Sequence, residues 1–152
     1  MLEMKVKTVT TDTGGGFTVF LTDSEGKKVL PIVVGPFEAQ AIAFPLQGQE
    51  PPRPLTHDLM KNLCLELGGV LKKIVITDII DNTFYALIYL DLKGKDISMD
   101  ARPSDAIALA LRFNAPIYMT LKMIEFTFNY EDIFKEKGDG EDDEEEGGPT
   151  QH

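Results

Sequence analysis

Apolar and polar positions alternate with a period of two near the start of the chain, over residues 4–11. The alternation over 4–11 predicts a half-buried strand, because successive side chains of a strand point to opposite faces. Two further runs, 17–22 and 28–34, flank a turn at 23–26 and predict a hairpin. An Ala-rich segment from Pro36 to about Gln47 then predicts a helix, since proline suits the first helical position.

A second helix is expected over 56–67, where the apolar residues recur with the helical period and Gly68 and Gly69 end the pattern. We expect the apolar stripe of this helix to face the core. The stripe consists of Leu59, Met60, Leu63, Cys64 and Leu67. In this position Cys64 would be an inert, buried thiol.

The remaining segments again predict strands followed by a helix. A three-stranded meander, a Pro-started helix and a short strand are expected over 70–80, 83–92, 95–100, 103–112 and 117–119. Residues 121–134 fit either a helix or an irregular arm. Strand groups with short hairpin links, separated by helices, indicate an α+β fold with a mainly antiparallel sheet.

The segments 35–44 and 102–111 match position by position, at an offset of 67 residues. Proline aligns with proline, Glu38 with Asp105, and three alanines with three alanines. We interpret this match as a duplicated unit of three strands and a helix, with an extra helix between the repeats. The alternative is convergence between two Pro-started, Ala-rich helices. Duplication predicts that 17–44 and 84–111 superpose.

Charge divides the chain into a body, 1–134, and an acidic tail, 135–152. The net charge is −10 over 152 residues. The tail holds eight acids and two bases, which leaves 17 acids and 13 bases in the body. We expect the tail to be disordered, either as a solubilising segment or as an electrostatic competitor for a basic surface. The body lacks the basic footprint of a protein that binds duplex DNA.

Composition also restricts compartment and cofactor. A single cysteine precludes an internal disulfide and suits a reducing cytoplasm, which is the location we expect. It excludes a zinc site built on cysteines, and two histidines make a multi-histidine metal site improbable. We expect no membrane-spanning or targeting segment.

A polar cluster surrounds the predicted helix starts. Its candidate catalytic residues are Glu38, His57, Asp58, Asp100, Arg102 and Asp105. Glu38, Asp100 and Asp105 are candidate ligands for Mg²⁺ or Mn²⁺, which prefer carboxylate oxygens, and Arg53 and Arg102 could hold phosphate.

The same cluster also has a structural interpretation. Glu38 and Asp105 fit third-position helix caps, and Thr56 fits an N-cap, with Asp58 favourable in the first turn. His57 could make a structural hydrogen bond, and Arg102 could pair with an acid to close the fold.

Three stretches resemble the bifunctional nuclease domain family of prokaryotes and plants. They are 30–39, 53–59 and 102–110, in that order along the chain. The resemblance implies an α+β fold, oligomer formation, and the nuclease activity on DNA and RNA described for plant members. It covers about the first 125 residues.

Two functional hypotheses therefore stand. One is a metal-dependent nuclease that acts on DNA or RNA, with single-stranded or short substrates favoured because the body is acidic. The other is a non-catalytic oligomeric binding or regulatory domain, in which the polar cluster stabilises the fold. In either case we expect a homo-oligomer, most simply a dimer. Six small residues are expected to let a sheet or another helix approach closely: Ala39, Ala41, Ala43, Ala106, Ala108 and Ala110. Further apolar groups lie close to the carboxy end of the domain: Ile117, Tyr118, Met119, Phe126 and Phe128.

Overall fold

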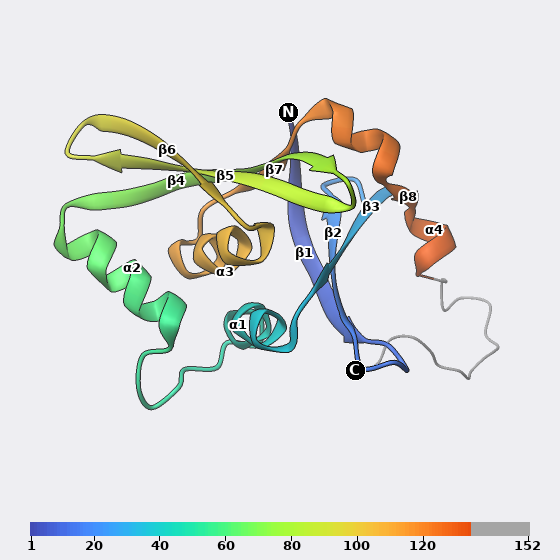
Figure 1. The fold of residues 1–152 in the computed structure, drawn as a ribbon, viewed down its shortest axis with the longest axis horizontal. Coiled ribbons are helices and arrows are strands. Elements are labelled where there is room, and N and C mark those ends of the chain that lie inside the picture. The colour runs from blue at the N-terminus through green and yellow to red at the C-terminus, as the bar shows by residue number, and fades with distance from the viewer. Residues whose placement is uncertain (135–152) are drawn as a thin grey trace.

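A computed structural model describes residues 1–134 of the chain (Figure 1). The acidic tail predicted over 135–152 lies outside the described residues. Eight strands and five helical segments follow one another in the order β1 (Leu2–Thr11), β2 (Phe17–Asp23), β3 (Lys28–Val34), α1 (Pro36–Leu46), α2 (Thr56–Glu66), β4 (Gly69–Ile80), β5 (Thr83–Leu92), β6 (Lys95–Ala101), α3 (Pro103–Phe113), β7 (Ile117–Met119), η1 (Leu121–Phe126), β8 (Phe128–Asn129) and α4 (Tyr130–Ile133).

One sheet holds all eight strands, in the order β6-β5-β4-β7-β1-β2-β3-β8. Every neighbouring pair is antiparallel except β4 and β7. Figure 1 shows α1, α2 and α3 together on one side of this twisted sheet. The predicted α+β class with a mainly antiparallel sheet is confirmed.

Two units of three strands and a helix make up most of the chain. β3 begins at Lys28 and β6 at Lys95, while α1 begins at Pro36 and α3 at Pro103, so the offset is 67 residues for both pairs. The first strand of each unit also carries a β-bulge, between Val6 and Thr8 in β1 and between Leu71 and Lys73 in β4. Shared strand order and a shared bulge support the duplication.

For the middle strands, β2 and β5, the predicted correspondence between the two units is wrong by two residues. Phe17 pairs with Val34 in the first unit, and Ala86 pairs with Ala101 in the second. Since Val34 and Ala101 are equivalent, the structural counterpart of Phe17 is Ala86 rather than the residue expected from the sequence offset. The second hairpin differs because it closes in a tight turn with positive φ at residues 93 and 94.

The core lies between the sheet and the two Pro-started helices, and α3 is buried along most of its length. Alanines hold α1 and α3 close together inside the chain: Ala39, Ala41, Ala106, Ala108 and Ala110 are all buried. Their small side chains are therefore occupied within one protomer. The expectation that these small residues let a sheet or another helix approach closely is thus met within one protomer, where Ile117 and Met119 are also buried.

The helix α2 contradicts the predicted orientation of its apolar stripe. Leu59, Met60, Leu63 and Leu67 are all exposed, and α2, which the structure describes in full, has no buried residue. Of the predicted stripe, only Cys64 turns inward, where it is half-buried and burial raises the pKa of its thiol.

For the segment after β7 the sequence left open a helix or an irregular arm, and the structure contains both helical turns and extended residues. The segment forms the six-residue 3₁₀ helix η1, the two-residue strand β8 and the short helix α4. Phe134 packs edge-to-face on Phe20, so this arm covers part of the β1–β3 half of the sheet. Within residues 1–134, no helix is long and apolar enough to cross a membrane.

Candidate functional site

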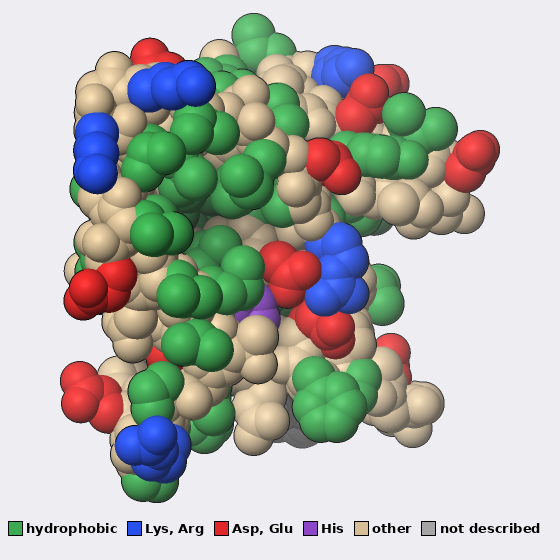
Figure 2. All heavy atoms as spheres, turned by 60° about the vertical axis from the view of Figure 1, so that its left-hand side comes forward, with side chains coloured by type: hydrophobic (Ala, Val, Ile, Leu, Met, Phe, Trp, Pro, Cys, Tyr) green, Lys and Arg blue, Asp and Glu red, His purple; other side chains and the backbone are tan. Residues whose placement is uncertain are grey.

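A hollow of about 640 Å³ lies where the first turns of α1, α2 and α3 meet. It is lined by side chains from all three helices, among them Phe37, Glu38, His57, Arg102 and Asp105. Figure 2 shows the hollow as a recess in which the purple histidine lies beside acidic and basic side chains. Four of the six predicted site residues therefore line one recess.

Arg102 bridges the two equivalent carboxylates of the repeats. Its Nη1 lies 3.2 Å from Glu38 Oε2, and its Nε donates to Asp105 Oδ2 at 3.0 Å. In the part of the chain that the structure describes, neither α1 nor α3 has a side-chain N-cap hydrogen bond. Glu38 and Asp105 lie in the first turns of these helices, as the cap interpretation expects, and both also bind the shared guanidinium of Arg102.

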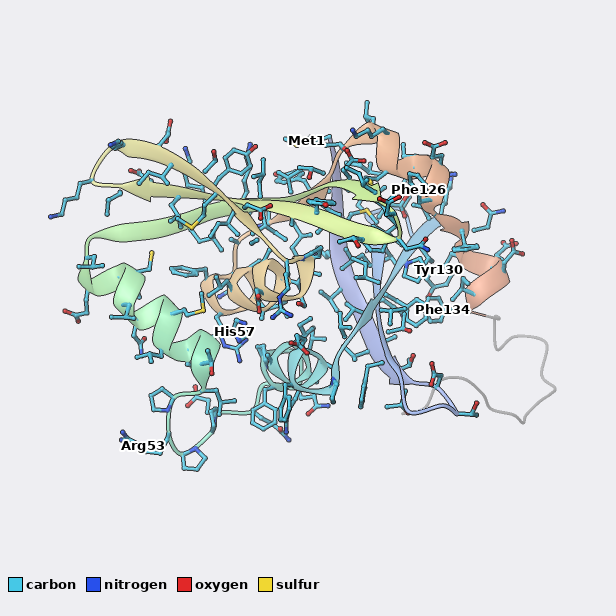
Figure 3. The ribbon with its side chains drawn as sticks, viewed as in Figure 1. Met1, Arg53, His57, Phe126, Tyr130 and Phe134 are labelled. Carbon is cyan, nitrogen blue, oxygen red and sulfur yellow. The ribbon has the colours of Figure 1, made fainter. Side chains whose placement is uncertain are left out.

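His57 binds the other oxygen of Asp105. Its Nε2 lies 2.9 Å from Asp105 Oδ1, and the imidazole is only 12% exposed. An ionised carboxylate can only accept, so Nε2 carries the proton of this hydrogen bond. When the ring is neutral, Nδ1 then keeps a lone pair. Figure 3 shows His57 directed from the start of α2 toward α1 and α3.

The ionisation of Asp105 reflects these partners. Burial alone would raise the pKa of Asp105, but hydrogen bonds and charge from Arg102 and His57 outweigh it and hold the pKa below its usual value. The carboxylate is therefore ionised at neutral pH, and as a hydrogen-bond acceptor it fixes the orientation of the imidazole.

Asp58 belongs to a second, structural network. Its Oδ1 accepts from Arg112 Nε at 2.6 Å, and its Oδ2 accepts from the backbone N–H of Leu55 at 2.9 Å. Leu55, not Thr56, is the N-cap residue of α2, so the predicted cap was one residue late. Burial alone would raise the pKa of Asp58. The hydrogen bonds from Leu55 and Arg112 outweigh this effect, so the pKa lies below its usual value.

Arg112 is the important residue that sequence reasoning missed. Its side chain is 6% exposed, and Nη1 donates to the carbonyls of Ala41 and Ala108 at 2.7 and 3.0 Å. Arg112 thus joins α1, α2 and α3 behind the recess. In the sequence, Arg112 could have been noticed as the one cation in α3, placed directly after the apolar run 106–111.

Asp100 and Arg53 do not line the recess. Asp100 is exposed on β6, and Arg53 lies in the loop before α2, where Figure 3 shows it pointing away from the body. Among residues 1–134, no three His, Cys, Asp or Glu side chains gather as ligands for a metal. Glu38 and Asp105 supply only two carboxylates, and Arg102 already binds both, so the arrangement as it stands does not fit a divalent ion.

The recess combines an oriented imidazole with an accessible cation. His57 could accept or donate a proton, because Asp105 holds its ring in a fixed orientation. Arg102 is 64% exposed despite its two ion pairs, so its outer face is available to a phosphate or carboxylate oxygen. Such a site suits acid–base chemistry on an anionic substrate. It equally suits binding an anion without chemistry.

A family model and plant relatives indicate one family for this chain. A family model described as the bifunctional nuclease domain matches residues 19–128. An uncharacterized protein of Mycobacterium tuberculosis is 48% identical over 101 residues, which are 66% of this chain and 60% of the relative. Bifunctional nuclease 1 of Oryza sativa subsp. japonica is 29% identical over 62% of this chain and 30% of its own length. Bifunctional nuclease 2 of Arabidopsis thaliana is 27% identical over 59% of this chain and 28% of its own length.

Proposed function

Because this chain belongs to the bifunctional nuclease domain family, we propose that it is a nuclease that hydrolyses phosphodiester bonds at the recess between α1, α2 and α3. The observation that carries the proposal is the His57–Asp105 hydrogen bond of 2.9 Å, with Arg102 on the same carboxylate. The chain spans about 60% of the length of the mycobacterial relative and about 30% of the length of the plant relatives. The activity of the whole relatives is therefore only proposed for this chain.

In the proposed reaction, His57 is the general base. A water oxygen attacks phosphorus while its proton passes to the imidazole, the new P–O bond forms, and the bond to the leaving sugar oxygen breaks. Asp105 stabilises the imidazolium that results, and the leaving oxygen takes a proton from solvent. Arg102 holds the non-bridging phosphate oxygens, whose negative charge grows as the reaction proceeds.

The proposed substrates are single-stranded or short nucleic acids. The described body holds 17 acids and 13 bases, so a long duplex would meet net repulsion on either side of the recess. A cytoplasmic location remains a prediction from the single cysteine.

Dependence on Mg²⁺ or Mn²⁺ also remains a prediction. A metal held by Glu38 and Asp105 would have to displace Arg102 from both carboxylates. Since that arrangement differs from the present one, no step of the proposed reaction uses a metal. Assays with and without EDTA test the dependence directly.

A cleavage assay with matched preparations tests the proposal. The wild-type chain, Asp105→Asn and a mock purification are passed over the same columns and incubated with an end-labelled single-stranded oligonucleotide. Cleavage that co-elutes with the wild-type protein and is lost in Asp105→Asn supports the nuclease. Equal cleavage by all three preparations means a contaminating host enzyme and defeats the proposal.

The second candidate function is a non-catalytic binding domain. It is favoured by one observation: Glu38, Arg102, Asp105 and His57 all have partners within the chain, as a purely stabilising network requires. In that case Asp105→Asn lowers stability, and the recess binds an anion on Arg102 without turnover. Oligonucleotide binding without cleavage distinguishes this function from the first.

A further inference from the structure

The sheet has an outer face, which is the side opposite α1, α2 and α3 (Figure 1). Successive side chains of a strand point to opposite faces, so a residue next to a core position points outward. In β5, Ala86 and Ile88 belong to the core, and Tyr89 therefore lies on the outer face. This face is separate from the recess, which the helices form on the other side of the sheet.

A hollow of about 400 Å³ opens on the outer face, over β4, β5 and β7. Two tyrosines and two lysines line it: Tyr89, Tyr118, Lys72 and Lys73. Lys73 pairs with Tyr89 across β4 and β5, and its Nζ lies 4.9 Å from the centroid of the tyrosine ring. This cation–π contact holds a positive charge beside an aromatic ring.

Each repeat adds a lysine to the outer face through its β-bulge. The bulge in β1 leaves Lys7 without a cross-strand partner in β2, and the bulge in β4 leaves Lys72 without one in β5. Lys7 Nζ lies 5.8 Å from the ring centroid of Tyr130, in the arm that covers part of this face. Both lysines are exposed. A bulge changes the direction of a side chain, so both repeats use it to present a cation.

A row of residues extends from the hollow across the sheet. The registers of β7 with β4 and with β1 place Lys73, Pro116 and Lys5 side by side. With Tyr89 they form the outer row, which crosses four neighbouring strands. Three strand spacings of about 4.8 Å make the outer row about 14 Å long.

Acidic side chains border the outer row without cancelling its charge. Asp96 pairs with Lys72 at 3.1 Å, but the two side chains are 82% and 50% exposed. An ion pair so exposed contributes little, so a phosphate can replace Asp96 on Lys72 at small cost. Glu3 lies opposite Tyr118, and Asp100 follows on β6. The acids on β6 limit the basic surface at that edge of the sheet.

We infer that the outer face binds single-stranded nucleic acid, with an unpaired base on the tyrosines of the hollow and phosphates along the lysines. Aromatic side chains stack on any unpaired base, while lysines follow the backbone. A duplex offers no free base to Tyr89 or Tyr118, because its bases are stacked on one another. At about 3.4 Å per stacked nucleotide, the outer row spans about four nucleotides.

This site goes beyond the proposed function, because it lies across the sheet from the recess and its use requires no bond cleavage. Its partner is of the class proposed as the substrate of the recess. The test must therefore separate binding at the outer face from binding at Arg102.

Fluorescence anisotropy with a labelled oligothymidylate of about 12 nucleotides tests the inference on the full chain. Tyr89→Val removes the ring and keeps a residue that favours strands. The control Tyr85→Val makes the same change on the same strand and face, at a tyrosine that is 39% exposed and outside the hollow. Arg102→Gln removes the cation of the recess, and circular dichroism verifies that each variant folds.

We expect micromolar binding by the wild type and about tenfold weaker binding by Tyr89→Val. Tyr85→Val and Arg102→Gln should bind within about twofold of the wild type, since neither residue lies in the outer row. An abasic oligomer of equal length should bind about tenfold more weakly than the oligothymidylate. Lys73→Gln should weaken binding and reduce its slope against log salt by about 0.7, and it replaces Tyr89→Val if that variant does not fold.

Undetectable wild-type binding, or equal losses in Tyr89→Val and Tyr85→Val, overturns the inference. A loss confined to Arg102→Gln also overturns it, because the strand then binds in the recess, as the nuclease proposal alone requires. Loss in Tyr89→Val without cleavage by any preparation upholds the inference and defeats the nuclease. Polyglutamate that competes as well as unlabelled oligonucleotide overturns the inference in favour of an acidic protein segment.

Discussion

Asp58 Oδ1 accepts a hydrogen bond of 2.6 Å from Arg112 Nε, and this ion pair joins the start of α2 to the end of α3. Arg112 also reaches the carbonyl of Ala41 in α1, so one cation connects three helices. The recess that holds His57 is built on this connection. The geometry of the recess should therefore depend on Asp58 and Arg112, although neither residue lines the recess.

Removing one partner of this pair should destabilise the fold. Asp58→Ala leaves Arg112 buried without its counter-ion, and the free energy of unfolding should fall by about 3 kcal/mol. Denaturant titration measures the change. The control Asp96→Ala removes an exposed ion pair with Lys72 and should cost less than about 1 kcal/mol. Equal losses in the two variants would contradict this reading of Arg112.

The Asp105→Asn variant should separate catalysis from stability. The amide keeps the size of the carboxylate but loses its charge, so the imidazolium of His57 is no longer stabilised. If the nuclease proposal is right, the cleavage rate should fall by a factor of about 100 or more. The melting temperature should fall by only a few degrees. A large loss of stability with no measurable wild-type cleavage would favour the binding domain.

The pH dependence of cleavage should identify the base. A histidine base must be neutral to accept a proton, so the rate should rise with pH through the range in which imidazole titrates. His57→Ala should lower the rate and flatten this acid limb. A limb that persists unchanged in His57→Ala would assign the base to another group.

Acid should weaken the fold through Asp58 and Asp105. Both have pKa values below normal in the folded chain, so each stabilises the fold above the pKa of the unfolded chain, near 4. That stabilisation is lost as the pH falls through the lower, folded pKa. The melting temperature of the wild type should therefore drop below about pH 4. The drop should be smaller in the Asp58→Asn, Asp105→Asn double variant, and an equal drop would contradict the assignment.

Gly35→Ala should disturb the Glu38–Arg102 pair alone. A Cβ at Gly35 would lie 2.5 Å from Glu38 Oε1, so the carboxylate must move. Because Glu38 is a flexible side chain, stability should change by less than about 1 kcal/mol. A crystal structure of the variant would show whether Arg102 remains on Asp105. Retention of the Glu38 contact would contradict the steric argument.

Local patterns predicted most elements of this fold. The strands followed from alternation, the hairpins from their turn residues, and α1 and α3 from proline followed by alanines. The orientation of α2 did not follow from its pattern. Periodicity tells which residues share a side of a helix, but it does not tell which side faces the core. The ion pair of Asp58 with Arg112 decided that question.

The candidate site was predictable only in part. Glu38 and Asp105 were found because the two repeats place them at equivalent helix starts. The contacts of His57 and Asp58 cross 48 and 54 residues of sequence, so no local rule indicates them. From the sequence, His57 and Asp58 could have served only to begin α2. The packing of α2 on α3 is what brings them to Asp105 and Arg112.

The bridge between Glu38 and Asp105 bears on why this fold is one chain. The repeats are equivalent at every position of the bridge except one, where Gly35 of the first unit corresponds to Arg102 of the second. Two identical half-length subunits could not build it, because glycine in both would leave two facing acids without a cation, and arginine in both would supply one guanidinium too many. Joining the halves covalently lets them differ at this position, and that difference breaks the symmetry where the symmetric arrangement is electrostatically unfavourable.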